Sequence, residues 1–345
     1  MGFRNHFRPV EHCILNFHGL VIRVSSPDAR VIDHLSRDFA FFSREQQDGV
    51  DLQLEAYLRT PDFHLVPDCE ASYIGPRNVV YNHGDQSFYD YFGQALLVER
   101  PGSAVASSED IDLLREVFYL YILSKVGLHL DKRGLHRLHA AAFSHRGKAS
   151  LLLCPSGGGK STTTFHLLSK DGYGLVSEDS PLVGSSGEIH PFPMCLGCKG
   201  KPPPDVPKRF LRTISRMEFD PKTLIDLEYF KDKIEQQPLP PGAVLIGIRH
   251  SGPTSEIEPT SRLGLFKFLL RDLVIGMGIF QGVEFLFRNR ISGLVRHSIV
   301  MASRLRSAVA LSRRGDPYIF RMGRDIDRNI ETLDRFLASG PEDRK

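Results

Sequence analysis

The sequence predicts an α/β protein with two domains, and three observations support this prediction. The chain has 345 residues, 41% hydrophobic and 25% charged, which suits one or two packed domains. Between residues 12 and 100, stretches with period-two alternation accompany one stretch with helical spacing. From residue 135 the pattern changes to strand, glycine loop, helix and strand, which is typical of an α/β core. We expect the domains to be 1–106 and 107–345.

The first of these domains is expected to be a small mixed α/β domain. Its β formers, alternating stretches and helical spacing give the elements, but none of them carries a chemical motif. We therefore interpret it as a scaffold or a partner-docking domain. Residues 101–107 are expected to form a linker. The elements expected in this part are strands at 13–24, 50–58, 79–81 and 88–98 and a helix at 28–42.

The second domain is expected to begin with a long helix. Ser107, with Asp110 three residues later, resembles a capping box, and apolar residues follow at core spacing until Gly127 or Gly134. Beyond the glycine loop, the same patterns predict a helical C-terminal region. The later elements expected here are a strand at 244–248, helices at 263–287 and 291–311, a strand at 318–321 and a helix at 326–337.

Charge and cysteine content exclude several classes of protein. Lysine and arginine number 44 and aspartate and glutamate 41, a net charge of +3, which does not indicate a nucleic-acid or membrane-surface partner. Five thinly spread cysteines suit a reducing compartment. The first ten residues lack the apolar stretch of a secretory signal, and charges interrupt the most apolar stretch, 263–287. We expect a soluble, cytoplasmic protein.

The strongest motif is a glycine loop at residues 150–163, with the sequence SLLLCPSGGGKSTT. Glycines let successive backbone N–H groups converge on an anion, and the following helix N-terminus adds unpaired donors. Lys160 is expected to reach the β- and γ-phosphates of a nucleotide, and the Ser161 hydroxyl to bind Mg²⁺. The residues expected to hold the nucleotide are Ser156, Gly157, Gly158, Gly159, Lys160, Ser161 and Thr162.

One position departs from the G-x-x-x-x-G-K-[ST] pattern, because Cys154 stands where a glycine is usual. We interpret Cys154 as a small buried residue at the strand end rather than a nucleophile. The alternative reading of the whole motif is a glycine-rich turn before an ordinary helix.

Two acidic residues, Glu178 and Asp179, follow the next short apolar stretch, at residues 175–177. If that stretch is a strand beside the loop strand, its end places two carboxylates next to the γ-phosphate. One carboxylate can then hold Mg²⁺ through water, and the other can take a proton from an incoming hydroxyl. The alternative is a solvated strand end with no chemical role.

These residues together resemble a known family. With Leu138-His139-Ala140, the loop at 155–161 and Val176-Ser177-Glu178-Asp179, the sequence resembles the catalytic domain of HPr kinase/phosphorylase. The phosphate loop of that family is similar to that of phosphoenolpyruvate carboxykinase. The resemblance covers residues 135–200 and is closer to divergent HPr-kinase-related proteins, including the lasso-peptide precursor kinases of peptide natural-product cassettes. It implies a P-loop HPr-kinase/phosphoenolpyruvate-carboxykinase-like core.

The resemblance also implies roles for individual residues. Lys160 and the loop amides hold the phosphates of ATP, Ser161 and Asp179 serve Mg²⁺, and Glu178 acts as the base toward a substrate hydroxyl. His139 matches the family's histidine near the active site, although a satisfied core histidine is the alternative. The family has two aspartates where this chain has Glu178 and Asp179, and its long glycine-rich signature is not found here. Phosphorylase activity is therefore not expected.

Weaker signals lie further along the chain. Cys195 and Cys198 form a C-x-x-C without a second pair, and we interpret it as a loop rather than a metal site. The stretch from Arg288 to Arg314 is rich in arginine and contains no acid. It is either a solvated face or a docking surface for an acidic peptide, whereas nucleic acid is not expected. A basic cluster that could bind phosphate or an acidic substrate consists of Lys199, Lys201, Lys208 and Arg209.

The leading hypothesis is an ATP- and Mg²⁺-dependent kinase. It would transfer the γ-phosphoryl group to a hydroxyl, above all a serine of a peptide or small protein. One alternative is a nucleotide-binding regulatory or assembly protein without phosphotransfer, and another is a kinase of a small metabolite. The family is often multimeric, so a homo-oligomer is also implied.

Overall fold

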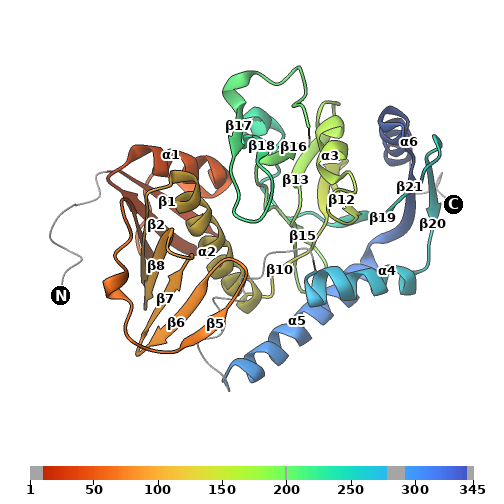
Figure 1. Ribbon diagram of the computed structural model, residues 1–345. Coiled ribbons are helices and arrows are strands. Elements are labelled where there is room, and N and C mark those ends of the chain that lie inside the picture. Colours follow the sequence, from red (N-terminus) through yellow and green to blue (C-terminus); the bar gives the residue numbers. More distant parts are fainter. Residues whose placement is uncertain (1–10, 199, 278–291, 340–345) are drawn as a thin grey trace. The chain divides into compact units, whose positions relative to one another are not determined.

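The computed structural model describes residues 11–198, 200–277 and 292–339, and these form two compact units (Figure 1). Unit 1 takes in the described residues up to His129 together with Leu211–Leu224 and residues 292–295. Unit 2 takes in Leu130–Phe210 and the described residues from Ile225 to Met277 and from Arg296 onward. The long helix α2 (Ile111–Lys132) begins in unit 1 and ends in unit 2.

Unit 1 contains a nine-stranded mixed sheet, with the helix α1 (Ala29–Asp38) in contact with its first two strands. Unit 1 also contains two 3₁₀ turns, at Ala40–Phe42 and at Phe63–Leu65. The strands, in their order across the sheet, are β3 (Ser43–Arg44), β1 (Glu11–Phe17), β2 (Leu20–Ser26), β4 (Leu52–Leu58), β9 (Ser103–Ser108), β8 (Ala95–Arg100), β7 (Gln86–Asp90), β6 (Val79–His83) and β5 (Ala71–Ile74).

Three expectations for this part were wrong. Residues 101–107 are not a linker, because β9 pairs with β4 on one side and with β8 on the other. The single strand expected at 88–98 is the antiparallel pair β7 and β8. The cap of α2 is Asp110 rather than Ser107, since the Asp110 carboxylate accepts the backbone N–H groups of Asp112 and Leu113.

Unit 2 is built on a six-stranded mixed sheet and also contains a short three-stranded sheet. The strands of the main sheet, in their order across it, are β13 (Tyr173–Ser177), β11 (Ala141–His145), β12 (Lys148–Leu153), β19 (Pro241–Arg249), β21 (Asp316–Met322) and β20 (Glu256–Pro259). The short strands of unit 2 are β10 (His136–Arg137), β14 (Leu182–Val183), β15 (Ile189–His190) and β16 (Leu196–Cys198). Two further short strands, β17 (Leu211–Ile214) and β18 (Lys222–Ile225), lie in unit 1 except for Ile225.

Helices cover both faces of the main sheet, so unit 2 is a three-layer α/β structure. Alternate residues of β12 point to opposite faces: Leu151 packs with α4 (Arg262–Leu269) and α5 (Ser292–Arg314), and Leu152 packs with α3 (Lys160–Leu168) and α6 (Ile326–Ala338). The remaining short turns of helix are 3₁₀ turns at Lys208–Phe210 and Leu227–Lys233 and a π-helical stretch at Leu270–Ile275.

The helix expected at 263–287 ends much earlier. After α4 and the π-helical stretch, Gly276 adopts a left-handed conformation (φ 74°) and closes the segment. Residues 278–287 of the expected helix lie outside the described residues. Among the described helices, none is both long enough and apolar enough to cross a membrane.

Strand direction decides which residues meet at the edge of the sheet. β12 runs parallel to β19, and β19 parallel to β21, whereas β11 is antiparallel to both β12 and β13. The carboxyl ends of β13, β12, β19 and β21 and the start of β11 therefore share one edge. The strand before the acidic pair was expected to lie next to the strand of the glycine loop. This expectation was wrong, because β11 lies between β13 and β12.

Candidate active site

The glycine loop joins β12 to α3, as its sequence predicts. Each of its three glycines is required by the geometry of the loop, for different reasons. Gly157 and Gly159 have φ of 78° and 108°, which L side chains rarely adopt. Gly158 donates its N–H to the Pro155 carbonyl, and a Cβ atom there would lie 2.9 Å from both that oxygen and the Cys154 sulfur. The loop conformation therefore needs glycine at all three positions.

The loop presents donors to an anion. No side chain caps the N-terminus of α3, so the N–H groups of its first turn are left without a capping partner. Ser156, Gly157 and Thr162 are exposed, and Ser161 is half-buried. Cys154 is buried, as expected, and burial raises the pKa of its thiol.

Lys160 is the centre of a buried cluster. Its side chain is only 7% exposed. Its Nζ donates to the Cys154 carbonyl at 2.9 Å and to Nε2 of His139 at 2.8 Å, and lies 3.3 Å from Oδ1 of Asp179. The strand end, the start of β11 and the acidic segment after β13 thus converge on a single ammonium group.

The lysine fixes the tautomer of His139. An ammonium group only donates hydrogen bonds, so Nε2 of His139 must accept, and the proton of the neutral ring is on Nδ1. That Nδ1 is buried without a hydrogen-bond partner and lies 3.6 Å from Oδ1 of Asp179. Burial lowers the pKa of His139, Asp179 opposes this effect, and the charge of Lys160 reinforces it. The imidazole is therefore neutral at pH 7.

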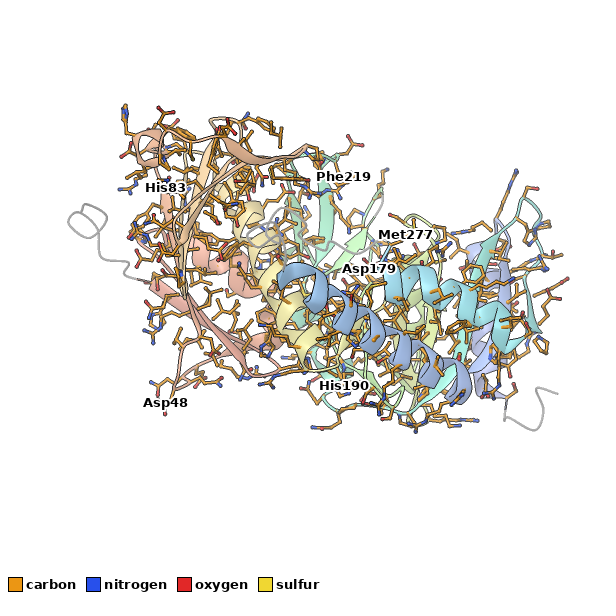
Figure 2. All side chains as sticks on the ribbon, turned by 90° about the horizontal axis from the view of Figure 1, so that it is seen from below. Asp48, His83, Asp179, His190, Phe219 and Met277 are labelled. Carbon is orange, nitrogen blue, oxygen red and sulfur yellow. The ribbon has the colours of Figure 1, made fainter. Side chains whose placement is uncertain are left out.

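The two acidic residues occupy different environments. Glu178 is buried, and its Oε2 accepts the backbone N–H of Met194 at 3.0 Å. The side chain of Asp179, which Figure 2 labels, is 47% exposed. Its Oδ1 lies 3.3 Å from Nζ of Lys160. Of the pair, Asp179 is thus the carboxylate that both faces the lysine and reaches solvent.

Two further residues lie at the site that the sequence did not predict. Arg249, the last residue of β19, donates from Nε to the Gly158 carbonyl at 3.1 Å. Asp272, on the π-helical stretch, is buried, and its carboxylate accepts a hydrogen bond from Arg271. The backbone carbonyl of Asp272 accepts the backbone N–H of His139 at 3.5 Å. An arginine at the end of an expected buried strand was the available signal for Arg249, whereas nothing in the sequence pattern pointed to Asp272.

The residues present fit Mg²⁺ only together with phosphate. Within the described ranges, no three His, Cys, Asp or Glu side chains cluster as a metal site. Ser161 and Asp179 offer oxygen atoms near the loop, and Mg²⁺ in nucleotide sites takes its remaining ligands from phosphate and water. In the C-x-x-C segment, Cys195 is buried and its thiol is directed at Asp226 at 3.8 Å.

The basic residues that the sequence singles out lie in different environments. Lys201, Lys208 and Arg209 are exposed, and Lys199 lies outside the described residues. In the arginine-rich stretch, Arg304 pairs with Asp131 at 2.7 Å, so that arginine serves the fold. The side chains of Arg288, Arg290 and Arg296 are not described. The exposed arginines described in this stretch are Arg306, Arg313 and Arg314.

Comparison with protein-family models finds no family that matches the chain, and comparison with curated proteins finds no match. The function of the chain is therefore inferred from the residues of the site.

Proposed function

We propose that unit 2 is an ATP- and Mg²⁺-dependent kinase that transfers the γ-phosphoryl group to a hydroxyl. The observation that carries this proposal is the buried Lys160 ammonium, held at the phosphate loop within 3.3 Å of Asp179 and 2.8 Å of His139. A cation, a glycine loop and a solvent-reaching carboxylate at one sheet edge are the parts that phosphoryl transfer needs.

Phosphate binding would use groups that the fold already orients. The backbone N–H groups of Gly157, Gly159 and the first turn of α3 would donate hydrogen bonds to the phosphates. Lys160 would supply the positive charge that pairs with them. Mg²⁺ would be held by the Ser161 hydroxyl and the Asp179 carboxylate, and it would neutralise charge on the phosphates.

The exposed fractions of the two acids support Asp179 as the proton acceptor, whereas the sequence hypothesis gave this role to Glu178. With one carboxylate oxygen on Mg²⁺, Asp179 would use the other to orient the incoming hydroxyl and accept its proton while the hydroxyl oxygen bonds to the γ-phosphorus and the bond to the ADP oxygen breaks. Such transfers depend on positioning and electrostatics more than on a strong base. Glu178, bonded to Met194, would act as a positioning residue that fixes the adjacent segment.

We propose a serine hydroxyl of a peptide or small protein as the acceptor and the cytoplasm as the location. The exposed Lys201, Lys208 and Arg209 support an acidic peptide, since clustered cations favour carboxylates. A metabolite acceptor and a nucleotide-binding protein without transfer are outcomes of the same test.

The test is incubation of the full chain with Mg²⁺ and γ-labelled ATP, against a library of serine-containing peptides and a metabolite pool. Lys160→Ala and Asp179→Asn should each reduce label transfer at least ~100-fold, as expected for groups that stabilise the transferred charge. Lys148→Ala and Asp171→Asn remove the same groups at exposed positions of unit 2 and should leave transfer unchanged.

Each outcome decides between the hypotheses. Label on a peptide that disappears in both site variants supports the kinase. Label confined to small molecules establishes a metabolite kinase instead. Measurable ATP binding without any labelled product overturns the kinase and leaves a nucleotide-binding protein.

A further inference from the structure

Arg249 lies at the phosphate loop on the side away from the acidic pair. Along the shared sheet edge, the order of strands places the end of β13 with Asp179 first, then the start of β11 with His139, then the loop after β12, and then Arg249 at the end of β19. The loop therefore has Lys160 and Asp179 toward one flank and a guanidinium on the other.

The guanidinium is anchored on backbone oxygens rather than on an acid. Nε donates to the Gly158 carbonyl, and Nη1 donates to the Gly323 carbonyl at 3.2 Å. Gly323 is itself fixed by the buried Asn329, which accepts from its N–H at 2.9 Å and donates to its carbonyl at 3.0 Å. Among the described residues, Arg249 forms no ion pair, so its positive charge is not neutralised locally.

The loop leaves room for this side chain. A Cβ atom on Gly159 would lie 2.7 Å from Nη2 of Arg249, so any other residue at 159 would displace the guanidinium. No acceptor for Nη2 occurs in the described part of the chain. Two of the five N–H donors hold the backbone, and the others are available at the edge of an anion-binding loop.

We propose that Arg249 binds the part of the phosphate chain that ATP and ADP share, as a second cation of the nucleotide site. This inference depends on the proposed nucleotide site, but not on phosphotransfer. Because the γ-phosphate must approach the acceptor at Asp179, the α- and β-phosphates extend toward the opposite flank, where Arg249 is held. Asn329 is then a positioning residue that acts through Gly323.

The alternative is that Arg249 only braces the loop, and three variants separate the two roles. Arg249→Met keeps the length of the side chain but removes the charge, and Arg249→Lys restores the charge. Arg321→Met is the matched control, because Arg321 pairs with Glu258 and lies opposite Ile248 on the neighbouring strand.

The measurements are the dissociation constants of ATP and ADP with the full chain at two ionic strengths, together with the melting temperature. Arg249→Met should weaken ATP and ADP equally, by roughly 10- to 100-fold, since charge-assisted hydrogen bonds to phosphate act on this scale. It should also flatten the salt dependence of binding. Arg249→Lys should recover most of the affinity, and Arg321→Met should leave both constants unchanged.

Other outcomes overturn the inference. Unchanged nucleotide affinity in Arg249→Met removes the contact. Equal losses in the Met and Lys variants, with a lowered melting temperature, show a brace alone. A loss confined to ATP shows that Arg249 meets the γ-phosphate, which contradicts the proposed direction of the chain. A protein that binds ATP through Arg249 but transfers no phosphate overturns the kinase and leaves this inference standing.

Discussion

At the scale of single residues, Gly159 meets two separate demands. Its φ of 108° is outside the range that other residues adopt easily, and the space over its Cα is taken by the Arg249 guanidinium. Gly147 has φ of 73° but nothing within 4 Å of a Cβ atom, so it carries only the conformational demand. Substitutions at the two positions therefore distinguish the effect of backbone strain, which both share, from the effect on the site, which only position 159 has.

Gly159→Ala and Gly147→Ala should differ in function more than in stability. Each should lower the free energy of unfolding by about 1–2 kcal/mol through the left-handed backbone. Only Gly159→Ala should weaken ATP binding, because it displaces Arg249. Isothermal titration with ATP and denaturant unfolding of both variants measure this. Equal ATP affinity in the two variants would contradict the role assigned to the space over Gly159.

His139 gives a second prediction, based on its hydrogen bond with Lys160. His139→Ala removes one of the acceptors of a buried ammonium and should slow phosphotransfer roughly 10- to 100-fold, the range for hydrogen bonds to charged groups. His139→Gln offers an amide oxygen to the lysine and should retain more activity than the alanine variant. Steady-state transfer rates compare them, and an alanine variant as active as the glutamine variant would show that the acceptor is dispensable.

Local sequence located the loop but could not assign all of its partners. The strand, the glycines and Lys160 are neighbours in the chain, so their geometry follows from local rules. Arg249 reaches the loop only because β19 pairs with β12, which depends on sheet order. The different environments of Glu178 and Asp179 likewise depend on Met194, which folds back against the end of β13.

At the scale of elements, a polar network ties the end of α2 to β10 and α5. Asp131 accepts from Arg304 at 2.7 Å and is bonded to Nδ1 of His136 at 2.7 Å. Nε2 of the same ring lies 2.8 Å from the Ser303 hydroxyl. Part of the arginine-rich stretch thus serves packing within unit 2, where the sequence suggested either solvent exposure or docking.

Asp131→Asn should lower the free energy of unfolding by about 3 kcal/mol at pH 7, because it leaves a largely buried arginine without its ion pair. Burial raises the pKa of Asp131, but hydrogen bonds from His136 and Arg304 outweigh it and hold the pKa below 3.8. The stabilisation is therefore present above pH 3.8 and lost as the pH falls through the lowered pKa. Chemical denaturation between pH 7 and 3 should show a shallower acid decline in the variant.

A matched control for that prediction is Asp232→Asn, an exposed acid of unit 2. It should change the free energy of unfolding by no more than ~0.5 kcal/mol at any of these pH values. An Asp131→Asn variant as stable as this control would contradict the importance of the network.

Element boundaries were predictable where hydrophobic periodicity is strong and not elsewhere. β21 and α6 occur close to their expected positions, because apolar residues mark their buried faces. β9 was missed, since its sequence SAVASS is small and polar and follows Pro101-Gly102. Its place in the sheet comes from pairing with β4 and β8, and neighbouring strands decide β structure more than intrinsic preference does.

At the scale of the whole molecule, the chain enters each compact unit more than once. Residues after position 210 return to unit 1, where Arg212 and Arg115 both pair with the buried Asp38. In the same unit Ser215 donates to Asp112 at 2.9 Å. Unit 1 is therefore completed by residues about a hundred positions beyond its sheet, and no single cut between the units respects its packing.

A fragment of residues 107–345 tests this organisation. It keeps Arg115 and Arg212 but removes Asp38, and it strips α2 of the sheet that packs beside it. We expect a fragment that lacks the near-ultraviolet circular dichroism of the full chain and binds a hydrophobic dye, because two arginines and an apolar helix face lose their partners. Asp38→Asn in the full chain keeps the sheet and should remain folded, with a free energy of unfolding lower by roughly 3 kcal/mol. A fragment that unfolds cooperatively and binds ATP as the full chain does would show instead that unit 2 folds without the first 106 residues.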